Sequence, residues 1–111
     1  MKVVNYIEFI KLPINTLYSD FTEDSCIINN IYCKQETISD NDWFYTNFTG
    51  TIEYDDDVYE SFSKLKNSLS LESDTTSIDR DGMFDRNRKF IVYEKQDIIN
   101  LMKVLKKALN E

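Results

Sequence analysis

The stretch KFIVYE at residues 89–94, followed by KQDIINLMKVLKKAL at residues 95–109, decides the fold. Residues 89–94 concentrate the β-branched and aromatic side chains that favour a strand. After them, apolar residues recur three or four positions apart, and lysines come late, where cations complement the negative end of a helix. We therefore predict a strand at 89–94 and a helix at 96–109. The apolar face of this helix consists of Ile98, Leu101, Met102, Leu105, Ala108 and Leu109.

A second amphipathic helix is predicted at about residues 57–70. Its apolar side chains recur at intervals of four, three and four residues from Val58 to Leu69, the spacing of one helix face. Asp57 and Glu60 have the separation of a capping box, and carboxylates in a first turn favour the positive end of the helix dipole. One cap does not need three consecutive acids, so part of the run Asp55–Asp57 remains available for a partner.

The rest of the chain predicts mainly strands and turns. Residues 3–12 suit a strand that stops at Pro13, and residues 43–54 suit another, with Gly50 marking a turn or bulge. Residues 14–23 fit either a short helical turn or a loop, residues 37–41 are loop-like, and Asp81-Gly82 is a turn signal. The resulting fold class is α+β: one domain over residues 1–111, with an antiparallel sheet and the two helices packed on one face.

The segment at residues 25–34 is a candidate hairpin that contains both cysteines. If Asn29-Asn30 forms its two-residue turn, Cys26 and Cys33 face each other across the strands. In a reducing cytoplasm both would remain thiols, and small half-buried apolar side chains are the simpler interpretation.

Catalytic and cofactor chemistry has little support in this composition. The chain has no histidine and two glycines, which removes the usual general base, the histidine-activated nucleophiles and a glycine-rich phosphate loop. Residues 79–85 resemble a calcium loop superficially, but Gly82 comes fourth where the EF-hand needs glycine sixth. A hydrolase with a pair of carboxylates stays open as an alternative, although a small domain has little volume for a cleft. We expect no enzyme activity, no cofactor and no metal site.

Negative charge is concentrated in the middle of the chain. The net charge is −7, but residues 20–60 hold eleven carboxylates against Lys34 alone, while residues 61–111 hold ten cations and eight acids. Aromatic residues are interspersed with these acids, and such a combination suits a surface that anchors a cationic protein. Direct binding of nucleic acid is disfavoured by repulsion from phosphates. The predicted partner-binding residues are Asp40, Asp42, Trp43, Tyr45, Glu53, Asp55, Asp56, Asp57 and Glu60.

The apolar runs are too short to cross a bilayer, and the N-terminus has no small-residue cleavage site. We therefore expect a cytoplasmic protein without membrane contact.

The C-terminal part of the chain resembles the ends of small acidic bacterial immunity proteins. The resemblance covers roughly the last 30 residues: the turn segment at 81–87, the strand that ends in Tyr93-Glu94, and the closing helix rich in leucine and lysine. Those proteins neutralise the secreted toxins of contact-dependent inhibition and related polymorphic toxin systems. The resemblance implies tight, stoichiometric inhibition of a cognate toxin domain, commonly a basic nuclease, and assigns no individual residues.

Two other functions stay open at this point. A nucleic-acid mimic that blocks a defence or restriction protein would need carboxylates spaced like phosphates along a ridge. An acidic secretion-type chaperone would expose an apolar groove and form a dimer.

Overall fold

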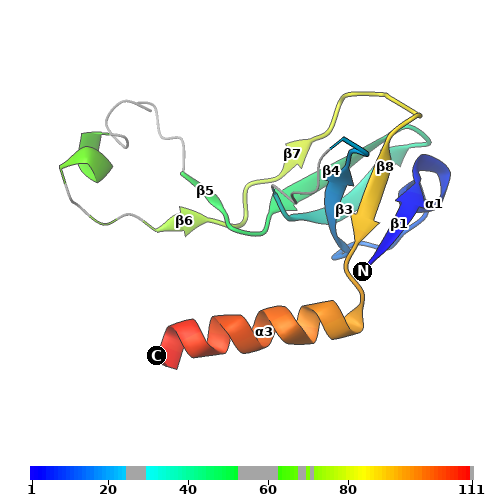
Figure 1. The fold of residues 1–111 in the computed structure, drawn as a ribbon. Coiled ribbons are helices and arrows are strands. Elements are labelled where there is room, and N and C mark those ends of the chain that lie inside the picture. Colours follow the sequence, from blue (N-terminus) through cyan, green and yellow to red (C-terminus); the bar gives the residue numbers. More distant parts are fainter. Residues whose placement is uncertain (25–29, 53–62, 68–69, 71, 111) are drawn as a thin grey trace.

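The computed structural model describes residues 1–24, 30–52, 63–67, 70 and 72–110. Its main element is a six-stranded antiparallel sheet with the strand order β1-β8-β2-β3-β4-β7, and β5 pairs with β6 in a separate two-stranded ribbon (Figure 1). The α+β fold class is confirmed. The elements are β1 (Lys2–Asn5), α1 (Tyr6–Ile10), β2 (Leu17–Phe21), β3 (Tyr32–Ser39), β4 (Asp42–Asn47), β5 (Thr51–Ile52), β6 (Ser73–Asp74), β7 (Asp79–Arg80), β8 (Lys89–Val92) and α3 (Lys95–Asn110).

The strand predicted at 89–94 is confirmed as β8, which lies inside the sheet. It pairs with β1 on one side and with β2 on the other, so that Ile91 is opposite both Val3 and Ser19. Phe90, Ile91 and Val92 are all buried. A run of consecutive apolar residues therefore marks a strand that is covered on both faces.

The segment at 3–12 does not form one strand, and the prediction is wrong beyond Asn5. There the chain enters α1, and the Oδ1 atom of Asn5 accepts a hydrogen bond from the backbone N–H of Glu8 at 2.9 Å. Tyr6 and Phe9 lie three positions apart, on the same side of this helix, and both are buried. Asparagine is a preferred N-cap, and this local bond favours the helix over a longer edge strand.

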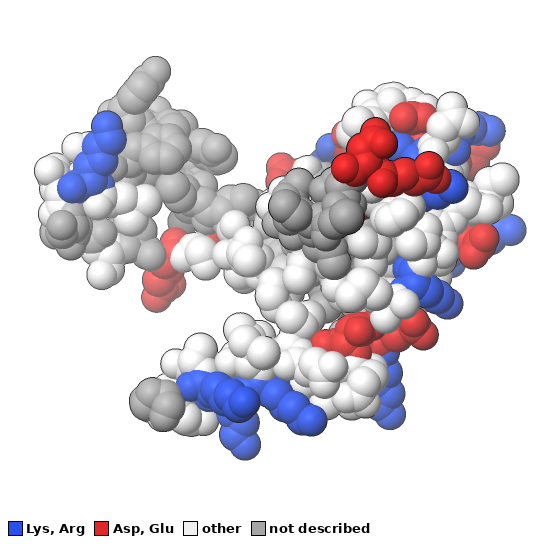
Figure 2. Space-filling model, in the orientation of Figure 1, with Lys and Arg blue, Asp and Glu red and all other residues white. Residues whose placement is uncertain are grey.

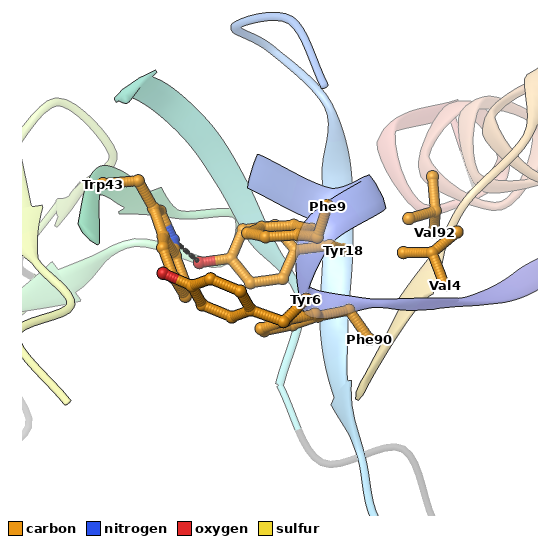
Figure 3. Packing of buried hydrophobic residues seen from close by; sticks show 7 residues of the cluster. All are labelled: Val4, Tyr6, Phe9, Tyr18, Trp43, Phe90 and Val92. Carbon is orange, nitrogen blue, oxygen red and sulfur yellow. Dashed lines mark hydrogen bonds between the residues drawn. The ribbon is translucent and has the colours of Figure 1, made fainter. Parts of the chain in front are cut away.

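One aromatic core lies between α1 and the sheet. The ring centroid of Phe9 is 4.0 Å from that of Phe90, 4.7 Å from Tyr18 and 4.8 Å from Trp43 (Figure 3). The indole N–H of Trp43 donates to the hydroxyl of Tyr18 at 2.9 Å, and burial raises the pKa of that hydroxyl. Edge and stacked contacts of this kind stabilise a small core beyond the area that they bury.

Within the ambiguous segment 14–23, Leu17–Phe21 form β2 rather than a helical turn or a loop. Ser19 is buried in the middle of this strand, where its hydroxyl lies 2.8 Å from that of Tyr93. On the next strand, Cys33 has Leu17 as its neighbour on one side and Thr46 on the other. Cys26, which would face Cys33 only if Asn29-Asn30 formed the hairpin turn, lies outside the described residues, so that prediction stays open.

The predicted loop at 37–41 is shorter than expected, because β3 continues to Ser39 through two shifts of register against β4. The strand predicted at 43–54 is interrupted between Asn47, where β4 ends, and Thr51, where β5 begins, and Gly50, predicted as a turn or bulge, lies in a turn. Gly50 has a φ of +78°, and an added Cβ atom would lie 2.8 Å from the Cβ of Ser73. Only glycine fits this turn, which leads into the β5–β6 ribbon.

The helix predicted at 96–109 is confirmed as α3, but its predicted packing on the sheet is wrong. None of its residues is buried, and Met102, Val104, Leu105 and Leu109 are largely exposed. Figure 1 shows α3 running away from the sheet, whose core face is covered by α1. Ile98, Ile99 and Leu101, near its start, are half-buried. No helix within the described residues is long and apolar enough to span a membrane.

Of the helix predicted at 57–70, residues 63–66 are helical, and the N–H of Asn67 donates to the carbonyl of Ser63 at 3.0 Å. The remainder of that prediction, apart from Asn67 and Ser70, lies outside the described residues.

Candidate partner-binding surface

Two of the predicted binding residues, Asp42 and Trp43, are fully buried, and the prediction is wrong for both. Trp43 belongs to the aromatic core. The carboxylate of Asp42 accepts hydrogen bonds from the backbone N–H of Trp43 at 3.0 Å and of Gly82 at 2.9 Å, and it forms an ion pair with Arg80. Burial alone would raise the pKa of Asp42, but the bonds from Gly82, Arg80 and Trp43 outweigh it and lower the pKa. Asp42 thus fastens β7 and the following residues to β4.

Tyr45 and Asp40 have different positions. Tyr45 is half-buried beside the core, with its ring centroid 5.1 Å from that of Tyr32, and burial raises the pKa of its hydroxyl. Asp40 is exposed at the turn between β3 and β4, where its Oδ2 lies 3.4 Å from the Nη2 of Arg86. The structure therefore keeps Asp40 on the surface. The remaining predicted residues lie outside the described part of the chain: Glu53, Asp55, Asp56, Asp57 and Glu60.

Arg88, which is not among the predicted binding residues, joins the strands to the segment after β7. Its guanidinium donates to both carboxylate oxygens of Asp81, at 2.9 and 2.8 Å, and to Asp20 on β2 at 2.7 Å. It also lies 5.2 Å from the ring centroid of Trp43 and 5.0 Å from that of Phe90. Burial of the guanidinium opposes its charge, but the bonds to Asp81 and Asp20 prevail and raise the pKa of Arg88.

The acidic middle of the chain is partly neutralised by cations that come much later in the sequence. Six of its eleven carboxylates lie in the described residues, and four of those form ion pairs with cations from residues 80–89. The pairs are Asp42 with Arg80, Asp40 with Arg86, Asp20 with Arg88, and Glu23 with Lys89. The described part of the segment is therefore not the uniform acidic face that we predicted.

An acidic excess nevertheless remains at this end of the sheet. We define the aspartate–arginine cluster as the charged residues within 79–88 together with the aspartates that they bind. It contains six carboxylates and three guanidinium groups, which leaves a formal charge of −3. Asp79 and Asp85 are exposed, and neither forms an ion pair within the described residues. The cluster consists of Asp20, Asp40, Asp42, Asp79, Asp81, Asp85, Arg80, Arg86 and Arg88.

The segment at residues 81–88, here called the β7–β8 loop, carries exposed apolar side chains among these charges. Met83 is 63% exposed and Phe84 is 49% exposed, with the guanidinium of Arg80 lying 5.6 Å from the ring centroid of Phe84. Asp81-Gly82 predicted the turn, and Gly82 has the expected positive φ of +65°. The Asp81-Gly82 signal indicates a turn, and the neighbouring pair Met83-Phe84 is the sequence feature that marks this loop as an exposed apolar element.

Charge elsewhere on the molecule is arranged differently. Figure 2 shows lysines along α3, and acidic side chains where this helix begins. Glu94 and Asp97 at that point bind the amino group of Met1, at 3.4 and 2.5 Å. The helix is therefore a cationic element, separate from the aspartate–arginine cluster.

A buried lysine and a shallow groove complete the set of candidate features. Lys34 is buried, and its ammonium donates to Thr37 at 2.8 Å and to the carbonyl of Gln35 at 3.2 Å; burial lowers the pKa of Lys34. A groove of about 400 Å³ is lined by Gln35, Glu36, Phe44 and Ile78. Within the described residues no three potential metal-binding side chains come together.

Comparison with known proteins adds no relative. No protein-family model, no curated protein and no solved structure matches this chain.

Proposed function

We propose that this protein is an immunity or inhibitor protein that binds a basic cognate toxin domain and blocks its active site. Among toxin domains, a nuclease is the class that we favour. It acts by binding and not by catalysis. The observation that carries the proposal is the acidic excess of the aspartate–arginine cluster, which surrounds exposed apolar side chains on a fixed loop. A nuclease holds phosphates with lysine and arginine, so exposed carboxylates complement its cleft and accelerate association.

The ion pairs within the cluster restrict which carboxylates serve this role. Asp42 and Asp81 are engaged by the protein's own arginines and have almost no exposed side-chain surface. Asp79 and Asp85 are exposed and unpaired within the described residues, and the pair of Asp40 with Arg86 is itself exposed. Exposed ion pairs are worth little and exchange readily, so Asp40 remains free to bind a cation of a partner.

The direct test is protection of cells. The chain is co-expressed with the toxin domain encoded by the neighbouring gene, and growth is compared with that of cells expressing the toxin alone. We expect protection and a stoichiometric complex. Failure of the chain to protect the cells and to bind the purified toxin domain would overturn the proposal.

The charge mechanism has its own test in the association rate. The double variant Asp79→Asn/Asp85→Asn removes the two unpaired carboxylates, and we expect it to bind more slowly and with a weaker salt dependence than the wild type. Glu72→Gln is the matched control, since Glu72 is an exposed acid next to β6, outside the cluster. An unchanged salt dependence in the double variant would exclude this mechanism.

A specific observation favours one second candidate, a secretion-type chaperone. The apolar stripe of α3 is exposed over its last turns, and a chaperone of that class would use such a surface and form a dimer. Light scattering coupled to size-exclusion chromatography separates the two functions, because the inhibitor is expected to be monomeric.

A further inference from the structure

The β7–β8 loop presents two neighbouring large apolar side chains to solvent. Met83 and Phe84 are both exposed, although the aromatic core lies directly beneath the ends of the same loop. Single exposed apolar residues are ordinary. Adjacent ones at the tip of a short loop require a reason, because burying both side chains would remove a large apolar area from water.

The backbone of this loop is held in a conformation that a phenylalanine rarely adopts. Gly82 has a φ of +65° and Phe84 a φ of +54°, so left-handed residues stand on both sides of Met83. Glycine takes this conformation without steric cost, but for a bulky L-residue it is an outlier. Such strain persists only where the surrounding structure imposes it, and it concentrates at functional positions.

The surrounding structure does impose it, from both ends of the loop. At the start, the N–H of Gly82 donates to the buried carboxylate of Asp42. At the end of the loop, Arg88 donates two hydrogen bonds to the carboxylate of Asp81, and its guanidinium lies over the ring of Trp43. The tip of the loop is thereby fixed before any partner arrives. A preorganised loop loses little conformational entropy on binding, which is what an interface anchor requires.

The charges around the tip indicate the chemistry of the partner. Asp79 and Asp85 flank the apolar pair and have no counter-ion within the described residues. Arg80, by contrast, is held by Asp42 and lies over Phe84. A complementary site would therefore offer an apolar pocket with lysine or arginine at its rim.

We propose that Met83 and Phe84 form the apolar anchor of the protein's binding surface and enter a pocket bordered by cationic side chains on a protein partner. This inference rests on the proposed function, and the partner is the basic toxin domain. It places the anchor on the β7–β8 loop instead of at Trp43 and Tyr45, where the sequence had suggested it.

The test compares loop variants with a control of equal exposure. The probe is the catalytically inactive toxin domain encoded by the neighbouring gene, and affinity is measured by titration calorimetry. Met83→Ser and Phe84→Gly are made singly and together. Met102→Ser on α3 is the control, because Met102 is also 63% exposed. Phe84→Gly removes the ring, and glycine adopts the positive φ of this position without strain. The variant should therefore fold normally, so that a loss of affinity reports the missing ring and not a misfolded loop.

We expect the double variant to bind at least 30-fold more weakly than the wild type, the loss associated with an interface hot spot. The control should stay within threefold, and all variants should keep the wild-type fluorescence spectrum of Trp43. A loss below 30-fold in the double variant, or an equal loss in the control, overturns this inference and leaves the proposed function standing. Absence of binding by the wild type overturns both.

Discussion

Replacing Arg88 by methionine tests how much the buried ion pair between Arg88 and Asp81 stabilises the fold. Methionine keeps much of the apolar stem of the side chain and removes the guanidinium. The side chain of Arg88 is 12% exposed and that of its partner Asp81 is 7% exposed. Three hydrogen bonds to carboxylate oxygens are lost, together with the contacts of the guanidinium to two aromatic rings.

The magnitude follows from the burial of Asp81. Removing one partner of a buried ion pair strands the other charge away from water, at a cost of about 3–5 kcal/mol. Arg86→Met is the matched control. Its side chain and that of Asp40 are both largely exposed and 3.4 Å apart, so its loss should cost less than about 1 kcal/mol.

The assay is urea unfolding monitored by the fluorescence of Trp43, the only tryptophan in the chain. Since Trp43 lies in the core against Phe9 and Phe90, its emission reports unfolding of the core itself. With a urea dependence of about 1.5 kcal/mol/M, the midpoint of Arg88→Met should fall by roughly 2–3 M. Equal midpoints for Arg88→Met and Arg86→Met would refute the argument, because they would show that burial adds nothing to this pair.

Three further predictions concern individual buried or strained residues, each measured by the same unfolding assay. The lowered pKa of Asp42 means that its charged form adds stability above about pH 4, and that this stability is lost as the pH falls. Asp42→Asn should therefore cost about 1–3 kcal/mol at neutral pH and flatten the acid limb of the stability curve; an unchanged acid limb would contradict it. The lowered pKa of Lys34 has the opposite consequence for a base: its charge opposes folding at neutral pH, and stability should rise as the pH approaches 10. Lys34→Met should add about 1 kcal/mol and abolish that rise, and a destabilised variant would show that the two hydrogen bonds of Lys34 matter more than its desolvation. Phe84→Gly should be more stable than Phe84→Ala by about 1 kcal/mol, because alanine retains the strained backbone; equal stability would mean that the strain is absent in solution.

The predictable parts of the fold were those whose signal lies within one short stretch. The run of β-branched and aromatic residues in β8 is compatible only with a strand, and the apolar periodicity of α3 only with a helix. Both elements were predicted correctly. The turns at Gly50 and Gly82 were predictable because a positive φ selects glycine locally. The packing of α3 was not predictable, since an apolar stripe shows that a helix can pack and does not show where.

Elements that depend on a distant partner were predicted less well. Tyr6 and Phe9 suit a strand as readily as a helix, and the cap at Asn5 decides between them. Within β2, Ser19 is polar yet buried, because Tyr93, 74 residues later, satisfies its hydroxyl. Asp42 and Trp43 follow acidic and polar residues, so their sequence context suggested a surface. The residues that bury the charge of Asp42 belong to β7 and the loop after it, about 40 residues away.

The same dependence on distant partners changes the meaning of the charge count. A segment with ten excess negative charges predicts a strong field only if those charges are not neutralised within the fold, and Arg80, Arg86, Arg88 and Lys89 neutralise four of them. The electrostatic field around the aspartate–arginine cluster is therefore weaker than the charge count suggests, and it surrounds the apolar tip of the β7–β8 loop, Met83 and Phe84. Salt screens the field and thereby affects the association rate, whereas the apolar contacts that we propose between the tip and a partner are insensitive to salt. If the anchor is correctly placed, raising the ionic strength should slow association and change the dissociation rate little. The Met83 and Phe84 variants should instead dissociate faster, with little change in the association rate.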